Sequence, residues 1–411
     1  MARIRRRTFL FGLGLAGAGA AGHALWTGLR YPPLQYDPDP FPETGYSEAG
    51  WRVHAPGSAS LRRHRVDGRM TFRAYVPEPV LRFEARRAGR VHLVLENLHR
   101  EARFEGLPGE ALRWQRPEEG GPGRREELYL DLDLSLGEVR ELRVRFPERE
   151  RYRFAALGDS GGGSELRWCL ERAAALDADF FLHLGDVLYL EAHETELEEA
   201  LRSSPLPVFA TPGNHDFHGG HRYRFETWQE EVGPLNSFFR LAGVDFVGLD
   251  TAADTLPPSR GERGRLMRRV EAFRAEHGPA PVVVFTHRPL SDWRYRKGRR
   301  DSPHALNRTG EAEYLQDWIL SLGSPAVLLC GHIHQTHFDG ETPVPMWIAG
   351  EGTSDRGPGA SILIGEFAPG EAPEFHLEAL AMPASRIDPR MRERQGAGAY
   401  PGFDFGPGER P

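Results

Sequence analysis

Carboxylate, amide, phenol and imidazole side chains recur where apolar segments of the C-terminal half of the chain end. Five short segments carry them: LGDSG, LGDVLY, PGNHD, VFTH and CGHIH. The residues concerned are Asp159, Asp186, Tyr189, Asn214, His215, Asp216, His287, His332 and His334. Side chains of these types bind metal ions and transfer protons, so they predict a reactive site if the fold brings them together.

The elements that must position these residues follow from hydrophobic periodicity. Strand patterns such as RYRFAALGD, DFFLHLGD, PVVVFTH and PAVLLCGHIH alternate with helical patterns over 164–177, 194–204, 261–277 and 309–322. Ser164 is predicted to cap the first of these helices. Alternation of this kind predicts a layered α/β domain, in which ligands gather outside the carboxyl ends of the strands. The five segments are therefore expected to converge.

Each segment alone is a weak signal. Aspartate after glycine is commonly a turn residue, and a single histidine at a strand end is commonly a hydrogen-bonded structural residue. Tyr189 fits two interpretations, an aromatic core residue or an unusual metal ligand. The ordered union of GDxG, GDxxY, GNHD, VxxH and GHxH favours a functional site.

That order of motifs over residues 152–368 resembles the purple acid phosphatases, within the calcineurin-like metallophosphoesterases. Most of the wider superfamily opens with an Asp-x-His pair, whereas this chain has Asp159-Ser160-Gly161. Purple acid phosphatases replace the missing histidine with the tyrosine of GDxxY, where Tyr189 stands. The resemblance implies an α+β, layered α/β fold: a β-sandwich flanked by helices, preceded by a smaller all-β sandwich domain.

The resemblance also implies two metal ions. Asp159, Asp186, Tyr189 and His334 would hold the first ion. Asp186, Asn214, His287 and His332 would hold the second, with Asp186 bridging. Two carboxylates and a phenolate suit Fe(III), while Asn and two His suit a softer divalent ion such as Fe, Zn or Mn. Three anionic ligands beside such a pair leave a net charge of about +2 to attract phosphate.

The mechanism implied is hydrolysis of a phosphomonoester by a hydroxide held between the metals. His215 would protonate the leaving alkoxide or stabilise the developing charge, and Asp216 would orient His215 or act as a simple cap. The loop after His287 lacks the histidines that many family members carry and is rich in arginine instead. Candidate substrate-binding residues are His218, His221, Arg294, Arg296 and His304.

The N-terminal region has a different organisation. Residues 1–24, with Arg6 and Arg7 before an apolar stretch, resemble a twin-arginine signal peptide, which predicts the Tat export machinery as a partner. The protein is then periplasmic or secreted, or membrane-anchored if the leader is not cleaved. A linker over 25–49 precedes a predicted β-sandwich domain over 50–148 and a catalytic domain over 149–380. A Gly/Pro/Arg-rich tail over 381–411 is expected to trail over the surface.

Composition narrows the functional classes. A net charge of −7 over 411 residues argues against a stable nucleic-acid partner, and a small phosphorylated substrate is expected instead. Cys169 and Cys330, the only cysteines, either pair or serve as small buried apolar residues. Two other functions stay open: a phosphodiesterase acting on nucleotide or glycerophospho-diesters, and a non-catalytic surface binding protein.

Overall fold

The structure is a computed structural model. It describes residues 46–48, 50–66, 68–115, 127–189, 193–217, 228–229, 231–252, 261–295, 302, 304–306, 310–323, 325–352, 360–386 and 388–390. The predicted signal peptide, the linker up to residue 45 and the tail beyond residue 390 lie outside these ranges. Within them, no helix is long and apolar enough to cross a membrane.

The N-terminal region consists of two five-stranded sheets that share one apolar core. The first has the order β1 (Tyr46–Glu48), β2 (Trp51–His54), β5 (Val80–Ala85), β10 (Val139–Arg145) and β7 (Arg103–Glu105). The second has the order β3 (Ala59–Val66), β4 (Arg69–Ala74), β6 (Gly89–Glu96), β9 (Glu127–Leu134) and β8 (Leu112–Gln115). Apolar residues such as Phe72 and Phe83 are fully buried between the sheets, as the alternating sequence patterns require.

The C-terminal region contains two further sheets. One has the order β13 (Val208–Ala210), β12 (Phe180–His183), β11 (Tyr152–Leu157), β20 (Ser361–Phe367) and β21 (Glu374–Ala379). The other has the order β14 (Ser237–Leu241), β15 (Val244–Gly248), β16 (Val282–Thr286), β17 (Ala326–Cys330), β19 (Met346–Ala349) and β18 (Thr336–Asp339). Neighbouring strands β11, β12 and β13 are parallel, as are β15, β16, β17 and β19.

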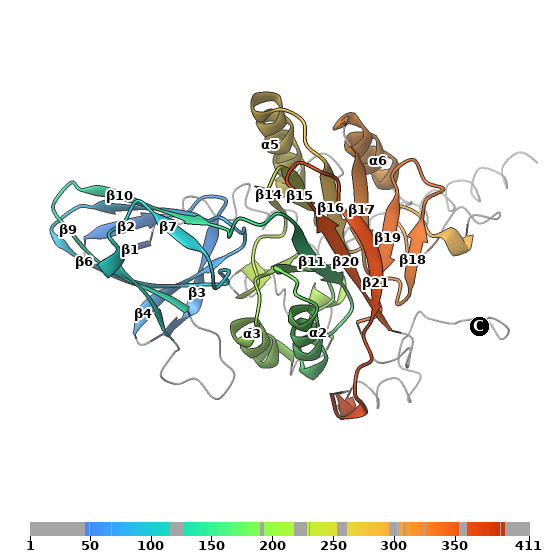
Figure 1. Ribbon diagram of the computed structural model, residues 1–411, viewed down its shortest axis with the longest axis horizontal. Helices are drawn as coiled ribbons and strands as arrows, with labels where there is room; N and C mark the ends of the chain where they lie inside the picture. The colour runs from blue at the N-terminus through green and yellow to red at the C-terminus, as the bar shows by residue number, and fades with distance from the viewer. Residues whose placement is uncertain are drawn as a thin grey trace, which may run out of the picture.

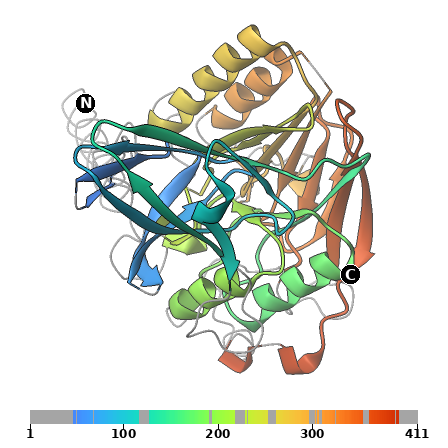
Figure 2. The same ribbon diagram turned by 60° about the vertical axis from the view of Figure 1, so that its left-hand side comes forward.

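Helices cover the outer faces of these two sheets. Helices α2 (Ser164–Ala175) and α3 (His193–Ser203) lie on the opposite side of the sheets from α5 (Gly261–His277) and α6 (Glu311–Ser321), as Figures 1 and 2 show. Between the sheets, aromatic residues including Phe154, Phe180 and Phe246 form a continuous apolar layer. The predicted layered fold, with sheets flanked by helices and preceded by β-sheets, is confirmed.

The N-terminal sheets are joined to the free edge of β13. The Asn97 side chain donates to the Val208 carbonyl at 2.9 Å and accepts from the Val208 amide at 2.8 Å, as a neighbouring strand would. The buried Arg73 guanidinium also donates to that carbonyl, at 3.2 Å. These bonds satisfy an edge strand that leads directly into the PGNHD segment.

Three sequence-based expectations are settled by the described residues. Ser164 does not cap α2, because Gly163 occupies the cap position and the Ser164 hydroxyl donates to the Arg386 carbonyl instead. The described part of the predicted tail, residues 381–386 and 388–390, does not simply trail over the surface, since Asp388 is buried against the domain. Cys169 and Cys330 form no disulfide bond, and both are buried.

Candidate metal centre

The predicted site residues lie at the carboxyl ends of strands from both C-terminal sheets. Strands β11, β12 and β13 lead into Asp159, Asp186 and Asn214, while β16 and β17 lead into His287 and His332. Backbone bonds connect neighbouring loops within each sheet: the Asp159 amide donates to the Gly185 carbonyl at 2.9 Å, and the Gly331 amide donates to the His287 carbonyl at 3.0 Å. The Gly158 amide, which donates to the Ala349 carbonyl at 2.7 Å, joins the two sheets. The parallel arrangement of the strands therefore brings five distant segments to one place.

The backbone is strained at three of these residues. Asp159 and Asp186 have φ angles of 62°, and His332 has a φ of 68°, which is the left-handed region that non-glycine residues rarely adopt. Such strain persists where the surrounding structure imposes it, and it concentrates at functional sites. The neighbouring positions must be glycine because a side chain would not fit there. A Cβ at Gly213 would lie 2.2 Å from the Asp186 Oδ1 atom, and one at Gly331 would lie 2.7 Å from the Asp159 Oδ2 atom.

A first group of donor atoms surrounds the Tyr189 hydroxyl. Its oxygen lies 3.1 Å from Asp159 Oδ1, 3.3 Å from Asp186 Oδ2 and 3.1 Å from His334 Nε2. His334 Nε2 lies 3.3 Å from Asp159 Oδ1. Tyr189 is buried, yet its hydroxyl faces polar atoms instead of the apolar core.

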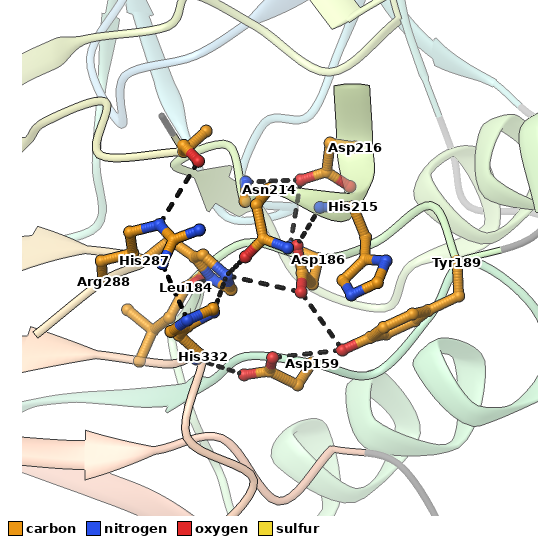
Figure 3. A network of polar contacts seen from close by, with 12 residues as sticks. Asp159, Leu184, Asp186, Tyr189, Asn214, His215, Asp216, His287, Arg288 and His332 are labelled. Carbon is orange, nitrogen blue, oxygen red and sulfur yellow. Dashed lines mark hydrogen bonds and ion pairs between the residues drawn. The ribbon is translucent and has the colours of Figure 1, made fainter. Parts of the chain in front are cut away.

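A second group of donor atoms lies on the other side of Asp186 (Figure 3). His287 Nε2 lies 3.4 Å from Asp186 Oδ2, 3.0 Å from Asn214 Oδ1 and 3.2 Å from His332 Nδ1. The His287 Nδ1–H donates to the Leu184 carbonyl at 2.8 Å, which fixes the tautomer that leaves Nε2 free to bind a cation. Asp186, His287 and His332 also form a cluster whose three donor atoms lie within 4.8 Å of one another.

These separations fit the coordination of metal ions. Ligand atoms about 2.0–2.2 Å from one ion lie roughly 3.0–3.5 Å from each other in tetrahedral or octahedral geometry. Both groups meet this condition, and both include the same atom, Asp186 Oδ2. The donor set therefore fits two ions that share the Asp186 carboxylate.

Two pKa shifts at this site favour metal binding and one opposes it. Burial lowers the pKa of His332, and the nearby Arg288 guanidinium, 3.0 Å from His332 Nε2, lowers it further. Burial alone would raise the pKa of Asp186, but His287 and His215 hold it well below its usual range. Neutral imidazole and ionised carboxylate are the forms that coordinate metals. Burial would lower the pKa of His287, but the Asp186 carboxylate raises it above its ordinary value, so a cation at His287 must displace a proton.

A comparison with models of known families identifies the C-terminal region. Its sequence matches the model described as calcineurin-like phosphoesterase over residues 152–336. Residues 152–336 form a calcineurin-like phosphoesterase domain. The five motif segments and all nine residues predicted from them fall within this range. A search of curated proteins with the whole sequence gives no match.

Solved structures with a similar arrangement share little sequence with this chain. GAP50, the anchor in the inner membrane complex of Plasmodium, is 13% identical with a TM-score of 0.41, over 64% of this chain and 99% of that one. Purple acid phosphatase PPD1 from yellow lupin seeds is 11% identical with a TM-score of 0.39, over 80% and 76%. A dimetal phosphatase from Danio rerio is 12% identical with a TM-score of 0.37, over 56% and 99%.

The two residues predicted to act in catalysis occupy different positions in the phosphoesterase domain. The His215 ring lies against the Tyr189 ring, with centroids 4.6 Å apart, and it points into the space between Asp186 and Tyr189 (Figure 3). Asp216 accepts bonds from four backbone amides, those of Gly213, Asp186, Val187 and Leu188, at 2.6–3.0 Å. Asp216 thus clamps the two ligand loops together, and its role in orienting His215 stays a prediction.

The predicted substrate-binding residues are only partly described. His218, His221 and Arg296 lie outside the described residues. The His304 ring lies 5.6 Å from the His332 ring, centroid to centroid, at the rim of the second donor group. Arg294 makes a two-point ion pair with the buried Asp292, at 2.9 and 2.7 Å, so its charge is already balanced locally.

Several residues that support the site have no counterpart in the sequence-based prediction. The Thr251 hydroxyl accepts bonds from the His287 and Arg288 amides at 3.1 and 2.8 Å, holding the VFTH segment in place. His183, buried in β12, lies 2.7 Å from the Ser160 hydroxyl through its Nε2. The sequence could have indicated a role for His183, because it is the one histidine in an otherwise apolar strand and stands directly before LGD. The position of Thr251 depends on tertiary contact alone.

Proposed function

We propose that this protein is a binuclear metallophosphatase that hydrolyses small phosphate monoesters. The observation that carries the proposal is the pair of donor groups joined at Asp186 Oδ2, inside a calcineurin-like phosphoesterase domain. Two cations held there would acidify a water molecule into a nucleophile and offset the charge of a phosphate group.

The surrounding residues have separable tasks in this reaction. The backbone amide of His215 donates to Asp186 Oδ1 at 2.8 Å, so the shared carboxylate is held from behind. The His332 amide does the same for Asp159 Oδ2, also at 2.8 Å. The His215 ring faces the space in front of these carboxylates, where it would give a proton to the departing alkoxide oxygen.

Substrate preference tests the proposal directly. Metal-loaded protein is expected to hydrolyse p-nitrophenyl phosphate faster than bis-p-nitrophenyl phosphate, and a chelator should abolish both activities. Faster hydrolysis of the diester would identify a phosphodiesterase instead. No turnover of either compound by protein containing two ions would favour the non-catalytic binding protein.

We further propose Fe(III) in the first donor group and Fe, Zn or Mn in the second. Tyr189 carries this prediction, because a phenolate bound to Fe(III) absorbs visible light and needs a strongly acidic ion for its deprotonation. Iron-loaded protein should show a broad visible band that disappears in Tyr189→Phe. Tyr152→Phe, which alters a tyrosine packed in the core, should leave the band unchanged. A colourless protein holding zinc or manganese would contradict the ferric assignment and strengthen the diesterase alternative.

Export by the twin-arginine route is part of the proposed function. The leader carries Arg6 and Arg7 ahead of a short apolar stretch. That route accepts folded proteins, which suits a site assembled with its metals before export. Periplasmic or secreted protein would then meet phosphorylated compounds outside the cytoplasm.

A further inference from the structure

A C-terminal segment, residues 380–386 and 388–390, lies along α2 and contacts Trp168, Glu171 and Ser164 of that helix. We name it the C-terminal strap. Its first contact is the Trp168 indole N–H, which donates to the Leu380 carbonyl at 3.1 Å. The Ser164 hydroxyl donates to the Arg386 carbonyl at 2.7 Å, at the start of the helix. The strap thus passes the start of α2, which follows the loop that carries Asp159.

His193 connects the strap to that loop. Its side chain is fully buried, and its Nδ1 accepts a bond from the Gly162 amide at 3.3 Å. Since Nδ1 is the acceptor, the proton of the neutral ring lies on Nε2, which donates to Asp388 Oδ2 at 3.2 Å. Burial lowers the pKa of His193, in agreement with this neutral form.

The His193 ring also fills the space beside the first donor group. A Cβ placed on Gly161 would lie 3.1 Å from His193 Cε1 and 3.5 Å from Tyr189 Cδ2. The imidazole, the Asp159 loop and the Tyr189 ring therefore pack together at one point. A change in the position of His193 would be felt by two of the four ligands in that group.

Asp388 is itself held in place by charged groups. The Asp388 amide donates to Glu165 Oε1 at 2.6 Å. The Arg390 guanidinium donates to both Asp388 carboxylate oxygens, at 2.9 Å each, and to Glu196 Oε1 at 2.8 Å. Burial would raise the pKa of Asp388, but the bonds from Arg390 and His193 lower it to about 2. His193, Glu196 and Asp388 could meet around a cation, but Arg390 already supplies the positive charge there.

We propose that Asp388 and His193 are positioning residues for the first metal ion, through the chain Asp388–His193–Gly162. The strap would thereby make the C-terminal residues part of the support of the Asp159 and Tyr189 loops. This inference rests on the metal centre of the proposed function. It assigns neither residue to contact with substrate.

The test is the rate at which zinc-loaded, full-length protein loses its ions to a chelator. Asp388→Asn should release one of the two ions about tenfold faster or more, the effect expected when the partner of a ligand-supporting residue is altered. His193→Ala should act similarly. His193→Asn, whose side-chain oxygen can still accept from Gly162, should restore slow release in part. Arg386→Ala, which removes the Arg386–Glu171 ion pair of the same strap, should match the parent and serves as the control.

The outcomes separate this inference from the proposed function. Equal release rates in Asp388→Asn, His193→Ala and the parent would overturn the positioning role, as would an identical acceleration in Arg386→Ala. A third ion in the parent that is missing from Asp388→Asn would show that the His193 cluster binds metal itself, and would also overturn it. Faster release of one ion from Asp388→Asn than from the parent, in a protein whose parent form hydrolyses no phosphate ester, would support the positioning role and refute the phosphatase.

Discussion

Replacing Asp186 by Asn should remove both metal ions and nearly all hydrolytic activity. Asp186 Oδ2 is the one atom common to the two donor groups, 3.3 Å from the Tyr189 hydroxyl and 3.4 Å from His287 Nε2. An amide offers one neutral oxygen and an N–H donor, so it cannot bridge two cations. Loss of several kcal/mol of charge stabilisation corresponds to a decrease in kcat/KM on the order of 10³-fold.

The fold itself should survive this substitution. Asp186 is fully buried. The pKa of the neighbouring Asp216 is raised to about 7, first by its own burial and second by the negative charge of Asp186. A neutral Asn removes that repulsion, but it also removes the attraction to His287 and His215 that holds the pKa of Asp186 low. The metal-free variant should therefore still fold, and it should unfold at or slightly below the temperature of the metal-free parent. Metal content, kcat/KM and thermal unfolding should be measured on the same samples.

Asp159→Asn provides the matched comparison, because Asp159 belongs to the first donor group alone. It should lose one ion and keep the other. Retention of both ions and full activity in Asp186→Asn would refute the shared ligand and with it the binuclear centre.

The residues of the donor groups could be predicted because they stand at the ends of strand patterns in the sequence. Asp159, Asp186 and His332 each follow a glycine at the end of a buried strand. The carboxyl ends of parallel strands lie at the same edge of a sheet, so these residues come close together. Short-range patterns contain that information. The pairing of Tyr189 with a missing Asp-x-His histidine can also be read from the sequence, because it needs only the two short motifs GDSG and GDVLY.

The supporting contacts could not be predicted in the same way. The His193–Asp388 bond joins residues 195 positions apart, and neither residue stands in a recognisable pattern. The Ser164 prediction was wrong for the same reason: a hydroxyl at a helix start usually caps it, but here a carbonyl 222 residues away takes the bond. Local propensity gives the elements, while the packing of distant segments decides what their polar side chains do.

The second large effect is expected at His215. His215→Asn should lower kcat by about 10²–10³-fold, the usual contribution of a general acid, while KM changes little. Both ions should stay bound, because the contact of His215 with Asp186 Oδ1 is made by its backbone amide, which the substitution keeps. This separates loss of chemistry from loss of metal, in contrast to Asp186→Asn.

The identity of the leaving group distinguishes the two roles predicted for His215. An alkoxide must be protonated as it departs, whereas p-nitrophenolate is stable without a proton. If the ring donates that proton, His215→Asn should slow an alkyl phosphate far more than p-nitrophenyl phosphate. An equal loss for both substrates would assign the ring, which lies beside Tyr189, to stabilising charge on the phosphoryl group. Unchanged kcat for both would exclude His215 from the catalytic step.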